Sequence, residues 1–358
     1  MATATAPVAS RVRPNVLRGA GLGLTCRQMM NTISFRSLTA ERTRLRVVGK
    51  DRKRFLHGMV SNDVQGLLPG HGCHAAMLTV KGKLIADLVL YDQGDDGLLI
   101  EVVKGAGEKL MTTLDRYLIM DDATISDVSS ELAELGVYGT PAAAALASSD
   151  ADPTLLLNLK PYHFLSTALE PSGSTAVPML IAATPELGLP GFHVLGPADR
   201  IAAMEERLRA AGAHPLSDEE QAALRIAAGT PLYGVDMTED HMPAEAGLDD
   251  AVSHTKGCYL GQETVVRLRD RGHLNRRLVG LRVAPGSGPA PAAGARLAHP
   301  SRPQAGVITS LARSPQHGLI ALGYVHRSAW DAGTELQLVD ADGAPTGATA
   351  VVSELPLR

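Results

Sequence analysis

The sequence predicts an α+β protein of two mixed domains followed by a small all-β barrel, and three observations support this fold class. Between residues 42 and 138, apolar runs with strand alternation are interleaved with amphipathic helices. A second segment of strands and helices occupies residues 155–274. From residue 275 to 358 the sequence changes to short alternating strands separated by turn residues, with no long helix between them.

The first domain, residues 42–138, is predicted from its alternation and from one helical stripe. Lys81-Gly82 separates two long apolar runs, which indicates a hairpin. Leu110, Leu114 and Leu118 recur at helical spacing and predict one apolar helix face. The expected strands are 43–49, 73–80, 83–92, 97–103 and 123–129, and the expected helices are 51–60 and 107–119.

Residues 139–154 are small and polar with two prolines, so they predict a linker or a long excursion. In the second domain, Ser217 and Glu220 form a capping box, and Gly229 ends the helix that they begin. The other expected elements are a strand at 190–196, a helix at 199–212, and barrel strands at 277–284, 305–314, 318–327, 334–339 and 348–354.

Composition bounds the functions that need consideration. The 358 residues are 45% hydrophobic and 20% charged, with a net charge of −4, which is typical of globular domains. Neither this charge nor the 3% of aromatic residues favours a nucleic-acid partner. No apolar run reaches the roughly 18 to 20 residues of a membrane span. We therefore expect no nucleic-acid or membrane partner. We also expect a monomer.

The first 41 residues form a separate compositional class. The first forty contain five arginines and no Asp or Glu, and they are rich in Ala, Ser and Thr. This composition resembles that of an organelle transit peptide, but a disordered tail or a start codon placed too early is the favoured explanation. We expect a disordered or targeting-like extension over residues 1–41. The expected location is a bacterial-type cytoplasm, with the mitochondrial matrix as the alternative.

One short stretch, "HTKGCYLGQETVVR" at 254–267, concentrates reactive residue types. A thiol reacts or ligates metal as the thiolate, and Lys256 is close enough in sequence to lower the pKa of Cys258. Gly257 and Gly261 leave the backbone free to approach a ligand. These residues predict a reactive or ligating thiol, and a buried inert cysteine is the alternative.

The cysteine count limits what this thiol can do. The chain has three cysteines and no C-x-x-C pair, so neither a disulfide framework nor a structural zinc site is predicted. An iron–sulfur cluster ordinarily needs four ligands, so a single cysteine cannot hold one. We predict no metal site and no stable metal cluster. The three cysteines are Cys26, Cys73 and Cys258.

Several segments resemble, in order and spacing, the folate-binding family that includes the glycine-cleavage aminomethyltransferases. The octet K-G-C-Y-x-G-Q-E is similar to the subgroup of YgfZ-type iron–sulfur cluster assembly and repair factors. The resemblance spans roughly residues 42–353 and is loose over 139–215. The segments are "FLHGMVSNDV" (55–64), "MLTVKGKLIADLVLY" (77–91), "LRIAAGTPLYGVDM" (224–237), "PAEAGLDDAVSHTKGCYLGQE" (243–263) and "RGHLNRRLVGLRV" (271–283).

The resemblance implies a ring of three domains around a central hole that holds tetrahydrofolate. Arg225 matches an arginine at the folate pocket of the transferases; a surface arginine is the alternative. Between apolar neighbours, its guanidinium needs a carboxylate or ring partner. Asp87 matches one member of the transferases' Asp-Asp pair, with Ala86 in the other place. Because Asp87 lies in an apolar strand, it is a candidate acid–base group.

The remaining candidate residues come from the motifs themselves. Asn62 is a candidate ligand-binding residue, or it caps a turn. From the octet, the candidate catalytic residues are Cys258 and Lys256, together with Asp87 in the strand, and the candidate folate-binding residues are Tyr259, Gly261 and Gln262. We treat histidines 71, 74, 241 and 273 as surface or core residues, because they lack metal-ligand spacing.

Two segments bear on the cofactor. Where the transferases have an acidic segment whose glutamate holds the pterin, this chain reads "LPGFHVLG" (189–196), without an acid. The resemblance therefore does not imply tight pterin recognition. The arginine-rich run from Arg267 to Arg277 could attract the polyglutamate tail of a cellular folate, or it is a solvated strand and turn. The expected cofactor is tetrahydrofolate, in its polyglutamylated forms as well.

These observations lead to a functional hypothesis with two alternatives. The first is a tetrahydrofolate-binding accessory factor for the assembly or repair of iron–sulfur clusters, acting through Cys258. Its partners would be folate and iron–sulfur assembly or client proteins. The second is a tetrahydrofolate-dependent aminomethyl or one-carbon transferase that depends on Asp87. The third is an interaction scaffold that depends on neither residue.

Overall fold

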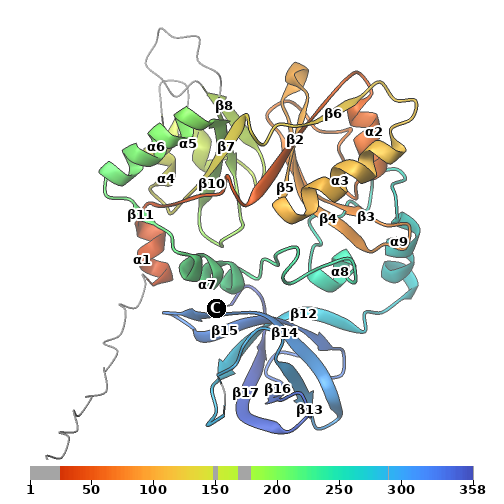
Figure 1. Ribbon diagram of the computed structural model, residues 1–358, viewed down its shortest axis with the longest axis vertical. Coiled ribbons are helices and arrows are strands. Elements are labelled where there is room, and N and C mark those ends of the chain that lie inside the picture. The colour runs from red at the N-terminus through yellow and green to blue at the C-terminus, as the bar shows by residue number, and fades with distance from the viewer. Residues whose placement is uncertain (1–24, 148–151, 168–178, 289, 358) are drawn as a thin grey trace, which may run out of the picture.

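The computed structural model describes residues 25–147, 152–167, 179–288 and 290–357. Two open, sheet-rich domains lie side by side, and a closed β-barrel lies across from both of them (Figure 1). The helices α7 (Asp218–Ala228) and α8 (Pro243–Ala246) lie between the two open domains and the barrel. The predicted α+β fold class with a C-terminal barrel is confirmed.

The first sheet is antiparallel in the order β3-β4-β5-β2-β6. Its strands are β2 (Arg42–Val48), β3 (Gly72–Leu78), β4 (Leu84–Asp92), β5 (Leu98–Val103) and β6 (Thr124–Asp127). The helices α2 (Arg52–Met59) and α3 (Lys104–Tyr117) bury one apolar face each against it. Lys81-Gly82 lies in the β3–β4 turn, as the hairpin pattern predicts.

The second sheet has the order β11-β1-β7-β10-β9-β8. Its strands are β1 (Ser34–Ser37), β7 (Leu132–Tyr138), β8 (Phe164–Thr167), β9 (Met179–Ala183), β10 (Gly191–Pro197) and β11 (His214–Pro215). Helices α4 (Ala142–Leu146), α5 (Pro153–Leu157) and α6 (Ala198–Ala210) accompany it. Helix α6 buries Ile201, Met204 and Leu208, three positions on one helical face, in the core of this domain.

Three of the expected boundaries are wrong. Residues 26–41 are not an extension, because α1 (Cys26–Asn31) precedes β1, and β1 pairs with β7 and buries Phe35. The first domain does not end at residue 138, because β7 belongs to the second sheet. Residues 139–147 are not a linker, because α4 buries Leu146 in the second core. The rest of the expected extension, residues 1–24, and residues 148–151 lie outside the described residues.

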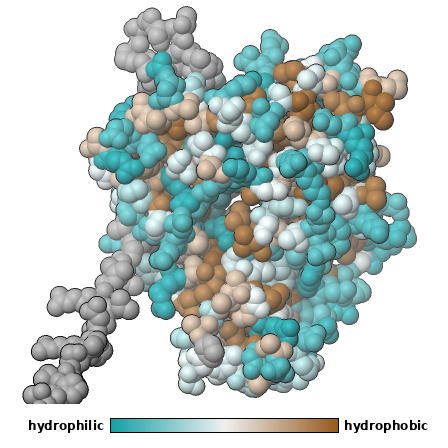
Figure 2. Space-filling model, viewed as in Figure 1, coloured by the Kyte–Doolittle hydropathy of each residue, from teal (hydrophilic) through white to brown (hydrophobic). Residues whose placement is uncertain are grey.

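The C-terminal barrel closes in the order β12-β15-β14-β13-β16-β17. Its strands are β12 (Arg276–Ala284), β13 (Arg296–His299), β14 (Arg302–Ser314), β15 (Gly318–His326), β16 (Glu335–Val339) and β17 (Pro345–Ser353). Helix α9 (Gln262–Arg271) leads into β12. No helix in the described part of the chain has both the length and the apolar character that crossing a membrane requires. Figure 2 shows a mixed surface on this face, without one continuous hydrophobic band.

Candidate functional site

A cavity of about 280 Å³ lies where the two open domains meet the segment that follows α7. The first sheet contributes side chains of β2, β3, β4 and β5, the second contributes β10, and residues 228–233 form a further wall. Its lining is strongly charged, with three basic and four acidic side chains. The charged residues are Arg42, His74, His193, Asp87, Glu101, Glu186 and Asp250.

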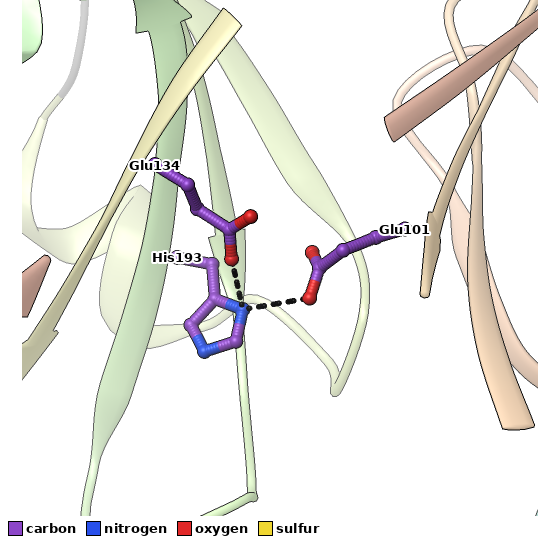
Figure 3. A group of neighbouring side chains, drawn as sticks. All are labelled: Glu101, Glu134 and His193. Atoms are coloured by element: carbon purple, nitrogen blue, oxygen red, sulfur yellow. Dashed lines mark ion pairs between the residues drawn. The ribbon is translucent and has the colours of Figure 1, made fainter. Parts of the chain in front are cut away.

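One wall of the cavity centres on His193, which lies on β10 and is 4% exposed. Its Nδ1 is 3.5 Å from Glu101 Oε1 and 3.3 Å from Glu134 Oε1, and its Nε2 is 3.3 Å from Glu186 Oε2. Glu134 comes from β7, beside β10, whereas Glu101 faces them from β5 of the other sheet (Figure 3). This imidazole therefore joins carboxylates of both domains.

Two arginines complete this wall. Arg42 donates from Nη2 to both Glu186 oxygens, at 3.0 and 2.9 Å. Arg44 donates from Nη1 to Glu134 Oε2 at 3.2 Å, and the Tyr91 hydroxyl donates to the carboxylate of Glu101. Each carboxylate of the wall thus has a charged or hydroxyl partner, which compensates for its burial.

The titration of this wall follows from burial and from these partners. Burial lowers the pKa of His193, but Glu101, Glu186 and Glu134 outweigh it and raise that pKa to about 10. Burial raises the pKa of Glu134 to about 7, and Glu101 adds to the rise. For Glu186, Arg42 and His193 outweigh burial and lower the pKa to about 2. Ion pairs among His193, the arginines and the glutamates therefore hold this wall together.

Glu101, Glu134 and His193 also have the spacing of a metal site, because their ligand atoms lie within 4.8 Å of one another. Three carboxylates meet two arginines here, so one further positive charge balances the group. A proton on His193 supplies that charge, and the raised pKa agrees with it. A metal ion binds the neutral imidazole, so it would compete with this proton for His193.

A second charged group at the cavity centres on His74 of β3, on the same sheet as Glu101. Its Nε2 is 2.5 Å from Asp87 Oδ1, and its Nδ1 is 2.9 Å from Asp250 Oδ2. The Tyr162 hydroxyl donates to Asp250 Oδ2 at 3.3 Å. Burial lowers the pKa of His74, but Asp87 and Asp250 raise it to about 10. Asp87, which the sequence singled out, thus has a cationic partner at the cavity.

The other candidate residues of the first domain and of α7 support this cavity without lining it. Asn62 donates from Nδ2 to the backbone oxygens of His74, at 2.7 Å, and Asp250, at 2.9 Å. Arg225 is buried and donates to Asp236 Oδ2 at 2.6 Å and to Ser310 Oγ at 2.8 Å. It therefore has the carboxylate partner that its apolar neighbours require, and it is not a surface arginine.

Arg225 also holds the wall segment 228–233. Its Nη1 donates to the Thr230 carbonyl at 2.8 Å, and Asp236 accepts from the Leu232 amide at 3.0 Å. Because Ser310 belongs to β14, the same guanidinium ties α7 and this segment to the barrel. Arg225 does not line the cavity, but it fixes the position of the segment that does.

The octet, residues 256–263, lies outside the lining of the central cavity. Lys256 donates from Nζ to the carbonyls of His57 and Val60 at the end of α2, and it lies 4.9 Å from the centre of the Tyr259 ring. Burial lowers its pKa to about 8. Lysine donors suit the unpaired carbonyls of a helix C-terminus. The contacts of Lys256 therefore run to α2 and Tyr259, and they fix the loop that carries Cys258.

The other octet residues build the same loop. Tyr259 is buried in a small apolar cluster, Gly261 is the N-cap of α9, and Gln262 donates from Nε2 to the Gly257 carbonyl at 3.4 Å. Cys258 is exposed, so the alternative of a buried inert cysteine is wrong. Neither Cys258 nor Lys256 is among the residues that line the central cavity. The geometry separates the thiol from Asp87.

The sequence prediction missed most of the charged lining. The sequence patterns place His74 at the surface or in the core, and they single out neither Glu101 and Glu186 of the lining nor Glu134 beside it. A signal was present for two of them, since Glu101 and Glu134 each lie within an apolar strand, as Asp87 does. The segment 189–196 has no acid, but Glu186, three residues before it, brings a carboxylate to the cavity.

Comparison with known proteins identifies the fold and the family. Residues 39–256 match the family model "GCVT N-terminal domain", and residues 276–357 match "Glycine cleavage T-protein C-terminal barrel domain". The crystal structure of the glycine cleavage system aminomethyltransferase T from Bartonella henselae superposes with a TM-score of 0.78 at 21% identity. That superposition covers 92% of this chain and 87% of that one.

Curated relatives agree. An aminomethyltransferase of Geobacillus kaustophilus is 33% identical over 241 residues, which cover 66% of this chain and 64% of that protein. An aminomethyltransferase of Rubrobacter xylanophilus is 34% identical over 283 residues, covering 77% of this chain and 72% of that protein. The chain thus aligns with slightly less than two thirds of the Geobacillus relative. With both domain models matched, it belongs to the glycine cleavage T-protein family and is homologous to aminomethyltransferases.

Proposed function

We propose that the protein binds tetrahydrofolate in the central cavity and transfers a one-carbon unit of the aminomethyl type. The names of its relatives support this reading. The observation that carries it is the position of Asp87. Its Oδ1 is engaged by His74, while no hydrogen bond to its Oδ2 is found within the described residues. One carboxylate oxygen is therefore available to a ligand.

The residues present fit the cofactor. A cavity of about 280 Å³ is at the lower end of small-molecule sites, which suits the ring system of a folate rather than its whole length. The ring and its attached nitrogens present N–H donors, for which the available Asp87 oxygen is an acceptor. Bound tetrahydrofolate would supply the nucleophilic nitrogen. Asp87 would orient that nitrogen and stabilise the positive charge that develops on it.

Titration calorimetry with tetrahydrofolate tests this proposal. We expect saturable binding to the wild type and at least about tenfold weaker binding to Asp87→Asn, because hydrogen bonds to charged groups contribute about 1.5 to 3 kcal/mol. Asp95→Asn is the matched control, since Asp95 is exposed and is not among the residues that line the cavity. Equal affinity of all three proteins, or no binding at all, would count against the proposal.

A second candidate function follows from Cys258, which is exposed on a loop outside the cavity lining. An exposed thiol suits contact with another protein, and the octet that carries it is similar to that of YgfZ-type factors. Under this proposal the protein assists the assembly or repair of iron–sulfur clusters in client proteins. Folate would bind at the cavity, and the thiol would act on the client.

Two substitutions separate the candidates. A transferase loses turnover with Asp87→Asn and tolerates Cys258→Ala. An assembly factor shows the reverse ranking when it complements a cell that lacks its own such factor, with the activity of iron–sulfur enzymes as readout. Rescue that persists with both Cys258→Ala and Cys258→Ser removes the thiol from the mechanism.

The polyglutamate tail of a cellular folate is a further point of the proposal. Arg267 and Arg269 lie on α9, where each contacts a neighbouring acid, Glu263 and Asp270 respectively. Replacing both arginines with serine should weaken binding of polyglutamylated tetrahydrofolate and leave the monoglutamate unaffected. Unchanged affinity for both forms would assign these arginines to the solvated surface of the helix.

A further inference from the structure

We propose that His74 is a positioning residue: as an imidazolium bridging Asp87 and Asp250, it fixes the orientation of the Asp87 carboxylate at the cavity wall. The inference rests on the proposed function for its consequence, because the oriented oxygen is the one offered to the ligand. The bridge itself is a property of the ligand-free protein. Asp87, His74 and Asp250 all line the cavity.

The protonation of His74 follows from its contacts. Both ring nitrogens are within hydrogen-bond distance of a carboxylate oxygen, at 2.5 Å for Nε2 and 2.9 Å for Nδ1. A neutral imidazole has one N–H, so one of these contacts would oppose two lone pairs. Only the doubly protonated ring donates in both directions. Tyr162 is the fourth titratable group at the bridge, and it donates to Asp250.

The bridge is built into the backbone. His74 of β3 lies opposite Val89 of β4, and Asp87 is two residues away on the same strand. Side chains in such a diagonal pair lie on one face of the sheet and can reach each other. Asn62 then fixes the third partner, because its amide donates to the backbone oxygens of both His74 and Asp250. Strand register and one amide thus set the whole arrangement.

Asp87, which is partly buried, differs from Glu186 and Glu101 at the cavity. Glu186 accepts from Arg42 with both oxygens, and Glu101 contacts Arg42 and His193 with one oxygen and Tyr91 with the other. Those groups are committed to joining the two domains. Asp87 is held through one oxygen alone. The His74 bridge therefore orients a partly buried carboxylate that keeps an oxygen for a ligand.

The bridge also restricts what faces it. One imidazolium between two carboxylates carries a net negative charge, so it favours a hydrogen-bond donor or a cation over an anion. A folate would therefore place its nitrogen-rich ring end at this wall and its glutamate end away from it. The protonated His74 bridge can be measured in the free protein. Its preference for a hydrogen-bond donor can be measured separately, in the complex with the ligand.

The first readout is the protonation of His74 in the ligand-free protein. ¹⁵N NMR of the histidine side chains should show that the His74 ring is still doubly protonated at pH 8.5. Exposed histidines are neutral at that pH. His74→Gln assigns the signal. Asp250→Asn removes one partner and should move the titration of the ring to lower pH. A neutral ring at pH 7.5 in the wild type would overturn the inference.

The second readout is tetrahydrofolate binding by calorimetry between pH 6 and pH 9. His74→Gln should bind about tenfold more weakly or worse, since it cannot donate to both carboxylates. Asp250→Asn should bind more weakly as pH rises through the lowered titration point of His74, a slope that the wild type lacks. Circular dichroism confirms that each variant is folded.

The outcomes are distinguishable. Wild-type affinity and an unchanged pH profile in His74→Gln would refute the positioning role. A wild type that does not bind tetrahydrofolate would refute the proposed function, and the NMR signal would still decide whether the bridge exists.

Discussion

Single buried charges decide how the parts of this protein meet. Arg225 shows the principle, since one guanidinium contacts Asp236, the Thr230 carbonyl and Ser310 of the barrel. Asp236 is 1% exposed, so its charge depends on that partner. A buried pair contributes little when it replaces a hydrophobic contact, but breaking it leaves an uncompensated charge.

Arg225→Met tests this at the level of one residue. We expect the free energy of unfolding to fall by about 3 to 5 kcal/mol, because Asp236 remains buried without its cation. Urea denaturation measures the loss. Arg302→Met is the control, since Arg302 is exposed and should change stability by no more than about 0.5 kcal/mol. Equal stability of both variants would contradict the assignment.

The cysteines give a second test at this scale. Cys258 is exposed, whereas Cys73 packs against the first core, and burial raises the pKa of its thiol to about 12. In a Cys26→Ser background, a thiol reagent at pH 8 should label one site quickly in the folded protein and the second only after unfolding. Cys258→Ala should remove the fast phase. A fast phase that remains would place the reactive thiol at Cys73.

Residue-level prediction from sequence was partial for a physical reason. Asp87 was found because an acid inside an apolar strand demands a partner, and the partner exists. His74 was missed because its importance lies in two carboxylates, one of them 176 residues away in sequence. Lys256 was expected to act on Cys258, but it contacts carbonyls that only the folded α2 presents. Contacts between distant segments are not visible in local patterns.

At the scale of elements, helices and hairpins were predictable, and of the second sheet only β10, expected at 190–196, was. The capping box at Ser217 begins α7 as expected, and alternation marked β4 and β5. Strand β7 has the sequence LAELGVY, without polar alternation, and every residue but the first is buried. It is extended because β1 and β10 pair with it on both sides. Nonlocal pairing overrode local propensity there.

The start of α9 offers a test of one element. Gly261 has φ +85°, and a Cβ placed there would collide with the Thr79 carbonyl oxygen. Gly234 has φ +86° with open space around it. Gly234→Ala should therefore cost about 1 to 2 kcal/mol of stability from its backbone alone. Gly261→Ala should cost at least about 1 kcal/mol more. Equal losses in thermal unfolding would show that the loop yields without strain.

At the scale of the whole molecule, the two open domains are joined by charge around His193. A histidine whose pKa rises to about 10 on folding stabilises the folded state fully below its ordinary value of 6.5, and it loses that contribution as pH rises toward 10. Glu186, with its pKa lowered to about 2, loses its contribution as pH falls below 4.5. Both contributions to stability are therefore complete only between pH 4.5 and pH 6.5.

Calorimetry should therefore give a higher melting temperature at pH 6 than at pH 9.5. His193→Gln should be less stable at pH 6 and should show a smaller decline between the two pH values, because its side chain has no proton to lose. His326→Gln is the control, since His326 lies at the end of β15 outside the cavity lining, and burial together with Arg302 and Arg327 lowers its pKa. A decline in His193→Gln as steep as that of the wild type would assign the pH dependence to other groups.

The cavity draws its walls from both open domains and from the segment that Arg225 ties to the barrel. A ligand bound in the cavity would therefore link the two open domains and the barrel, each of which has its own hydrophobic core. Without it, the units are free to melt in separate steps; with it, their melting should merge into a single cooperative event at higher temperature. The molecule that takes part in the reaction would then also stabilise the contact between the two open domains and the barrel.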